Sequence, residues 1–150
     1  MIVNTDSPHQ DGFDPSKLKL RLHAAIASDV AAVSLFTDQV MELVREMNCA
    51  EGKEFGMEMA LREALANAVL HGCKSDPGKQ VECYVACDDQ GGMYIVVRDP
   101  GQGYEPDTLP SPLEGENVFA THGRGIFLIN QLMDTVSYER GGAEIRMRKF

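Results

Sequence analysis

The chain has 150 residues, 43% of them hydrophobic and 25% charged, with a formal net charge of −9. This size and composition are typical of one globular domain with a buried core. Nucleic-acid phosphates repel an acidic chain, so we expect no direct binding of DNA or RNA. No apolar run reaches membrane-spanning length, and the first residues lack the basic and apolar regions of a signal peptide, which predicts a cytoplasmic protein with no membrane contact.

The N-terminal residues 1–16 are polar, contain two prolines and one glycine, and show no hydrophobic period. That composition predicts a mobile tail in front of a single domain over residues 17–150. From Leu18 to His23 leucines alternate with basic residues, which indicates a half-buried strand.

Two helices are predicted next. Ser28 and Asp29 can cap a helix, and hydrophobic residues then recur at helical spacing to about Asn48. A second helix is predicted over residues 53–71. It ends at Gly72, a residue type that is common just after the last helical turn.

The period then changes from helical to alternating. Residues 80–87 and 93–98 each alternate between two faces, and the intervening Asp-Gln-Gly-Gly sequence at 89–92 is typical of a tight turn. This pattern predicts an antiparallel hairpin. Residues 99–123 form a long segment rich in Gly and Pro, and such a loop in a compact domain is usually functional or mobile.

The last predicted elements are a short helix from Gly125 to about Met133 and a hairpin of residues 135–140 and 143–150 joined by two glycines. Strands with helices packed on one face make an α+β two-layer sandwich. We therefore expect a mixed, mostly antiparallel sheet with the helices on one face.

The four cysteines fit no C-x-x-C metal or redox pattern. Cys83 and Cys87 lie four residues apart in a predicted strand, roughly 13 Å along the chain, which is too far for a shared metal or a disulfide. The cysteines Cys49, Cys73, Cys83 and Cys87 are therefore predicted to be small core residues in a reducing cytoplasm.

The first candidate site lies on the second predicted helix. Glu63, Asn67 and His71 share one stripe of it, and apolar residues occupy the opposite side. An amide oxygen is a hard ligand for Mg²⁺, and a carboxylate one turn away can deprotonate an attacking hydroxyl. The alternative is an ordinary solvated polar face.

The second candidate is the sequence Asp-Pro-Gly-Gln-Gly, which begins at Asp99 directly after a predicted strand. Alternation places the Asp99 carboxylate on the core side, where it needs a partner such as the exocyclic amine of a purine. Gly101 and Gly103 would let the backbone approach the base closely. The alternative is a Pro-Gly turn that ends the hairpin.

The third candidate is Gly123-Arg124-Gly125, where glycines precede a predicted helix. Free amides and the helix dipole favour an anion at such a place, and Arg124 could bind a phosphate oxygen. The sequence has neither a Walker A motif nor a dinucleotide-binding fingerprint. The alternative is a flexible hinge.

In this order and context the three motifs resemble the N, G1 and G2 boxes of the GHKL ATPase superfamily, whose domain is the Bergerat ATP-binding fold. The resemblance covers about residues 18–150. The short chain and the ending G-R-G-I-F-L-I-N-Q-L-M-D-T-V-S-Y are similar to the anti-sigma factor/serine-protein kinase family of bacterial stress and sporulation switches.

This resemblance implies a role for each matched residue. Asn67 would bind Mg²⁺, Glu63 would act as the general base, Asp99 would bind the adenine amine, and Gly101 and Gly103 would shape the adenine pocket. Residues 104–122 would form the ATP lid. The positions assigned to the phosphates are Gly123, Arg124 and Gly125, with His71 and Lys74 within reach.

The resemblance implies an ATP-dependent serine kinase whose substrate is a small STAS-type anti-anti-sigma protein and which sequesters a sigma factor. It also implies a homodimer paired through the sheet edge near the N-terminus. One alternative is a nucleotide-dependent binding module with little kinase activity. The other is a histidine-kinase-like catalytic domain. The short chain and the presence of Glu63 count against it.

Overall fold

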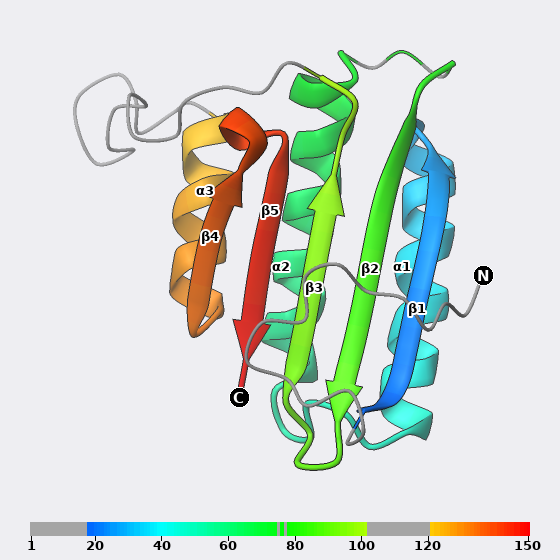
Figure 1. The fold of residues 1–150 in the computed structure, drawn as a ribbon, viewed down its shortest axis with the longest axis vertical. Helices are drawn as coiled ribbons and strands as arrows, with labels where there is room; N and C mark the ends of the chain where they lie inside the picture. Colours follow the sequence, from blue (N-terminus) through cyan, green and yellow to red (C-terminus); the bar gives the residue numbers. More distant parts are fainter. Residues whose placement is uncertain (1–17, 75, 77, 102–120) are drawn as a thin grey trace.

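The computed structural model describes residues 18–74, 76, 78–101 and 121–150, and for residues 121–126 it describes the backbone alone. Within these residues, five strands form one sheet in the order β1-β2-β3-β5-β4. Three α-helices cover one face of that sheet (Figure 1). The predicted α+β two-layer sandwich is confirmed. All four described strand pairings are antiparallel, so the expectation of a mixed sheet is wrong in that detail.

Strand β1 (Leu18–Ala27) lies at one edge of the sheet and pairs with β2 (Gln80–Asp88). Its alternate residues Leu20, Leu22, Ala24 and Ile26 are buried against the helices. The strand continues four residues beyond the predicted end at His23, because Ala24 and Ile26 extend the same alternation.

Helix α1 (Val30–Glu46) begins where it was predicted to begin. The Asp29 carboxylate caps it by accepting hydrogen bonds from the N–H groups of Ala31 and Ala32, at 2.7 and 3.3 Å. These bonds satisfy two donors that have no partner inside the helix. Its buried side chains are Val33, Phe36, Thr37, Val40, Met41 and Val44.

Helix α2 (Glu54–Asn67) is followed without a break by a π-helical turn, η2 (Ala68–Gly72). The Cys73 N–H donates to the Ala68 carbonyl oxygen at 2.8 Å, which closes the wider turn. The helix predicted over residues 53–71 is confirmed, apart from the π geometry of its last turn.

Strands β2 and β3 (Met93–Arg98) form the predicted antiparallel hairpin, which lies in the middle of the sheet. Its turn is held by the Asp88 carboxylate, which accepts from the N–H groups of Gln90 and Gly92 at 2.9 and 2.8 Å. Aspartate commonly organises a turn in this way.

Helix α3 (Thr121–Leu132) starts four residues before the predicted start at Gly125, so the Gly-Arg-Gly sequence lies inside its first turns. The final hairpin consists of β4 (Thr135–Glu139) and β5 (Glu144–Lys149), joined through a 3₁₀ turn, η5 (Arg140–Gly142). The predicted tail and most of the predicted lid lie outside the described residues.

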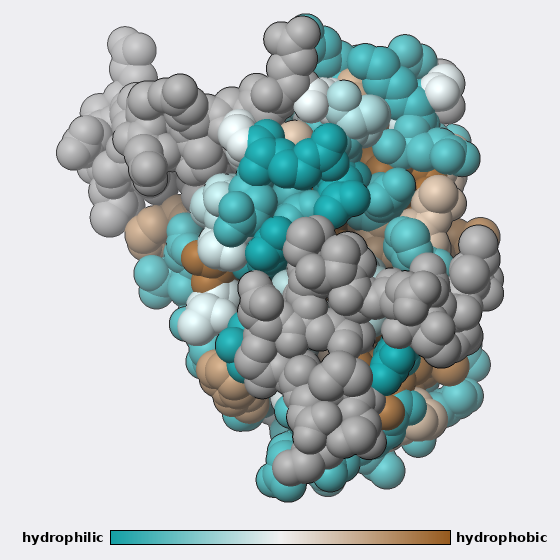
Figure 2. Space-filling model, in the orientation of Figure 1, coloured by the Kyte–Doolittle hydropathy of each residue, from teal (hydrophilic) through white to brown (hydrophobic). Residues whose placement is uncertain are grey.

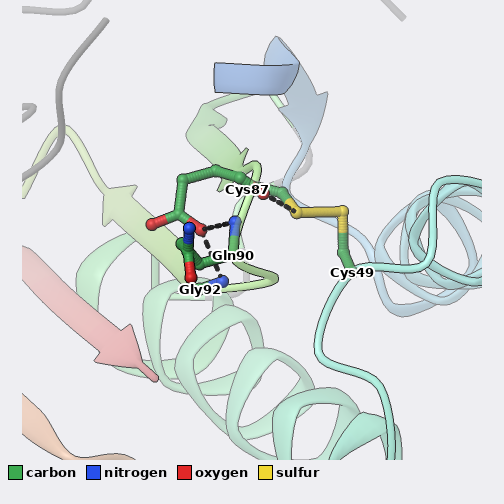
Figure 3. The surroundings of a disulfide bond; sticks show 5 residues. Cys49, Cys87, Gln90 and Gly92 are labelled. Atoms are coloured by element: carbon green, nitrogen blue, oxygen red, sulfur yellow. Dashed lines mark hydrogen bonds between the residues drawn. A yellow bond between two sulfur atoms is a disulfide. The ribbon is translucent and has the colours of Figure 1, made fainter. Parts of the chain in front are cut away.

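Two of the cysteines form a disulfide, so the prediction of four free thiols is wrong. Cys49, in the connection after α1, is bonded to Cys87 near the end of β2, with their Cα atoms 6.1 Å apart (Figure 3). The sequence separation is 38 residues, and only the packing of α1 on the sheet brings them together. Cys73 and Cys83 are buried free thiols, and burial raises the pKa of Cys83 strongly.

The sheet face opposite the helices carries a charge network, and Figure 2 shows hydrophilic residues over its upper part. At its centre the Glu144 carboxylate is buried and binds the guanidinium groups of Arg98 and Arg146, with Nε to oxygen distances of 2.6 and 2.8 Å. The positive charges of the two arginines offset the negative charge of the buried carboxylate. The network joins β3 to β5, next to the strand end that carries Asp99.

Candidate functional site

Helix α2 presents Glu63 and Asn67 on its half-buried side, one turn apart. The opposite side is buried in the core, as the sequence predicted, through Leu61, Leu65, Ala68 and Val69. The predicted polar stripe is therefore present at Glu63 and Asn67, because the opposite side of the helix packs against the core.

The π turn after Asn67 changes the position of the residues that follow. A π turn adds one residue to the helical circuit, so the i, i+4 stripe does not continue regularly beyond it. His71 and Lys74 are exposed, and Lys74 has a left-handed backbone with φ 52°. The sequence placed His71 on the same stripe as Asn67, and it could not foresee this turn.

Asp99 follows β3 and points to the helix-facing side, as alternation predicted. The residue is 6% exposed. The carboxylate accepts a hydrogen bond from the Gly101 N–H at 2.8 Å, and the Asp99 N–H donates to the Ala143 carbonyl at 2.8 Å. Burial raises the pKa of the Asp99 carboxyl, and the Gly101 N–H and the charges of Arg140 and Lys79 partly offset that rise.

A narrow cavity joins Asp99 to Asn67. Its lining consists of Ala64, Asn67, Ala68, Val97, Asp99, Tyr138, Gly142, Ala143 and Ile145. The free volume is about 20 Å³, which is room for one water molecule. The cavity as described is smaller than a purine ring.

The cavity wall opposite α2 comes from the C-terminal hairpin, and sequence reasoning missed it. Tyr138 of β4 and Ile145 of β5 line the cavity together with Gly142 and Ala143 of the connection. Alternation could have placed Tyr138 and Ile145 on the helix side. Only the strand order β3-β5-β4 puts this hairpin next to the end of β3.

Gly101 allows the Asp99 turn to lie against the end of the helix. A Cβ atom on Gly101 would lie 2.6 Å from the Gly72 carbonyl oxygen and 2.8 Å from Asp99 Oδ1. No residue with a side chain fits at those distances without movement of the backbone. The lack of a side chain at Gly101 is therefore needed for its contact with the protein's own backbone, and Gly101 is not among the residues that line the cavity.

The remaining predicted site residues are farther along the chain. Gly103 and residues 104–120 of the predicted lid lie outside the described residues. Gly123, Arg124 and Gly125 belong to the N-terminal part of α3, where their backbone is described. The structure thus brings Asn67 and Asp99 together at one cavity, and Glu63 lies one turn before Asn67 on the same helix.

The described residues contain neither a membrane-spanning helix nor a cluster of metal-binding side chains. In that part of the chain no helix is long and apolar enough to cross a membrane. The same residues contain no group of three or more His, Cys, Asp and Glu side chains that could hold a metal ion.

Comparison with known proteins decides the family. Residues 26–149 match the family described as the histidine kinase-like ATPase domain. The chain belongs to this family. The match spans both walls of the cavity and confirms the resemblance drawn from the three motifs, so that the domain is an ATP-binding one.

The domain is also similar to an anti-sigma F factor from Heyndrickxia coagulans. The two are 31% identical over 100 residues, which cover 63% of this chain and 67% of that protein. This likeness confirms the suspected anti-sigma branch of the family and supports a regulatory, kinase-like role for the ATPase domain.

The residues at the cavity fit the adenine end of ATP. A buried carboxylate charge costs free energy unless a hydrogen-bond donor faces it, and an exocyclic amine is such a donor. Among the described residues, the Gly101 N–H is the hydrogen-bond donor found for the Asp99 side chain. The apolar walls formed by Ala64, Val97 and Ile145 suit the flat faces of a purine.

Proposed function

We propose that this domain is an ATP-dependent regulatory serine-protein kinase that phosphorylates a small STAS-type anti-anti-sigma protein and sequesters a sigma factor. The observation that carries the proposal is the cavity between Asn67 and buried Asp99, with Glu63 one turn away on the same helix. The similarity to an anti-sigma F factor supports the choice of protein partners.

Each residue has a role in the proposed reaction. Asp99 would bind the adenine amine. The Asn67 amide oxygen would hold Mg²⁺, which offsets phosphate charge when bound. Glu63 would accept the proton of the substrate serine as the serine oxygen bonds to the γ-phosphorus of ATP. The bond between the γ-phosphorus and the oxygen of the β-phosphate would break, and ADP would leave.

In this proposal residues 104–122 would form the ATP lid, and Gly101 and Gly103 would shape the adenine pocket. The positions at the phosphates would be Gly123, Arg124 and Gly125, with His71 and Lys74 within reach of them. The N-terminal amides of α3 favour an anion, because they have no acceptor inside the helix. A cytoplasmic location and a homodimer complete the proposal. The first rests on the sequence composition, and the second rests on family resemblance.

The direct test is a pull-down with the purified domain in the presence of ATP or ADP, followed by mass spectrometry. We expect a sigma factor and a STAS-type protein phosphorylated on serine. Purified partner and radiolabelled ATP would then give the rate of phosphoryl transfer. Recovery of partners without any phosphorylation would favour the nucleotide-dependent binding module instead.

Glu63→Gln should lower the rate of phosphoryl transfer by about 10²-fold or more, while the ATP affinity stays within about threefold. Glu42→Gln is the matched control, because Glu42 is an exposed glutamate on α1, away from the cavity. An unchanged rate in Glu63→Gln would remove Glu63 from the mechanism.

Asn67→Ala should weaken Mg-ATP binding by about tenfold or more, since an amide ligand to the metal is lost. Titration calorimetry with and without EDTA measures this. The Asn67→Ala variant and the unaltered protein should bind ATP alike once Mg²⁺ is removed. Equal affinities in the presence of Mg²⁺ would contradict the metal assignment.

A further inference from the structure

Gly72 ends the π turn after the Asn67 helix, and its own backbone gives no reason for a glycine. Four glycines in the described chain have a left-handed φ, and Gly72 is not among them. Any residue could adopt its conformation. The requirement for glycine at this position must therefore come from what lies against it.

The Asp99 carboxylate lies directly against Gly72. A Cβ atom on Gly72 would lie 2.5 Å from Asp99 Oδ1 and closer still to Cγ and Oδ2. Gly56, which lies in the same helix, offers a contrast. A Cβ there would be 3.6 Å from a Leu132 methyl group, which is ordinary van der Waals contact.

The group that must yield to a side chain at position 72 is the Asp99 carboxylate. The Asp99 backbone is fixed by its N–H bond to the Ala143 carbonyl, whereas the carboxylate is the free end of a short side chain. Rotation of the Asp99 carboxylate would break its 2.8 Å hydrogen bond from the Gly101 N–H and would move the carboxylate out of the cavity lining. The sheet and the helix can keep their positions.

We propose that Gly72 is a positioning residue for base selection, an inference that rests on the proposed ATP binding. By lacking a side chain, Gly72 lets the Asp99 carboxylate lie over the end of the helix, where it can accept a hydrogen bond from an exocyclic purine amine. Gly72 acts through Asp99 and does not itself contact the base.

The test compares two nucleotides in the Gly72→Ala variant, with Mg²⁺ present throughout. One is ATP, and the other is purine riboside triphosphate, which lacks the exocyclic amine. The unaltered protein should bind ATP about tenfold or more tightly than the analogue. Gly72→Ala should lose this preference because ATP binds more weakly while the affinity for the analogue stays the same.

Gly56→Ala is the matched control and should keep the preference for ATP. A double-variant cycle with Asp99→Ala gives a second readout, since Gly72→Ala should have no further effect on ATP affinity once the carboxylate is gone. If Gly72→Ala alone fails to fold, the Gly72→Ala/Asp99→Ala variant should fold, because the clashing group has been removed.

The inference is overturned if Gly72→Ala keeps the preference for ATP, if it weakens both nucleotides equally, or if the double variant fails to fold where Asp99→Ala folds. These outcomes differ from failure of the proposed ATP binding, in which case the unaltered protein itself would bind neither nucleotide.

Discussion

Asp99 shows at the scale of one residue how a binding site can oppose stability. The carboxylate is buried against Gly72 at the end of the strand, and its raised pKa reports that the folded protein disfavours its charge. A ligand amine would add a second hydrogen-bond donor to the Gly101 N–H. In the proposed site Asp99 would therefore favour ligand binding at a cost to the stability of the unliganded protein.

Asp99→Asn should increase the free energy of unfolding of the unliganded protein by about 1 kcal/mol at pH 7, because it removes a buried charge and keeps an acceptor for the Gly101 N–H. The same variant should bind ATP about tenfold or more weakly, since a carboxylate is the stronger acceptor. Urea unfolding and titration calorimetry measure the two effects.

The pH dependence of that gain has a defined sign. A carboxyl whose pKa is raised in the folded protein contributes stability at pH values below its ordinary pKa of 3.8. That contribution is lost as the pH rises through the raised pKa of the folded protein. The stability advantage of Asp99→Asn should therefore grow as the pH rises above about 4. An advantage that shrinks over this range would contradict the buried charge.

At the scale of elements, the Cys49–Cys87 bond ties the connection after α1 to the end of β2, at the opposite end of β2 and β3 from Asp99 (Figures 1 and 3). Next to it, the Ala50 N–H donates to the Gly91 carbonyl at 3.0 Å, so that the helix connection and the hairpin turn also share a hydrogen bond. The disulfide therefore supports the fold and does not line the cavity.

Replacement of both Cys49 and Cys87 by Ala should lower the free energy of unfolding by up to about 4 kcal/mol, the loop-closure value for a separation of 38 residues. Urea unfolding with and without reductant measures it. Reductant should destabilise the unaltered protein and leave the double variant unchanged. Cys73→Ala is the control, because Cys73 is a buried free thiol, and it should keep the response to reductant.

At the scale of the whole molecule, the cavity is a junction of elements that are distant in sequence. Helix α2, strand β3 and the β4-β5 hairpin each contribute lining residues, and the described free volume of about 20 Å³ is too small for a purine. A base bound beside Asp99 would lie at this junction.

Mg-ATP should raise the thermal midpoint of unfolding in a concentration-dependent way. A ligand that binds only the folded state adds about 2.7 kcal/mol of stability at a concentration of 100 Kd. Differential scanning fluorimetry over a series of ATP concentrations checks this, with Asp99→Asn as the variant of reduced response. A midpoint that ignores ATP concentration would contradict nucleotide binding by the folded protein.

Much of this protein follows from its sequence because the signals are local. Alternation predicted the β2-β3 hairpin, Asp29 predicted the start of α1, and the order of the three motifs predicted the ATPase family. Alternation also placed the Asp99 carboxylate on the core side. The hairpin, the helix start and the side taken by Asp99 each depend on residues only a few positions apart, so backbone geometry and hydrophobic period are sufficient. The family depends on motifs that are each short and on their order along the chain.

Tertiary structure alone decided the rest. The strand order that places Tyr138 at the cavity, the Cys49–Cys87 bond, and the contact of Gly72 with Asp99 all join segments distant along the chain. Local pattern carries no information about such pairs, because they depend on how the finished layers pack. The sequence thus determined the elements and the family, and the packing decided which side chains meet at the cavity and why a glycine ends the helix beside it.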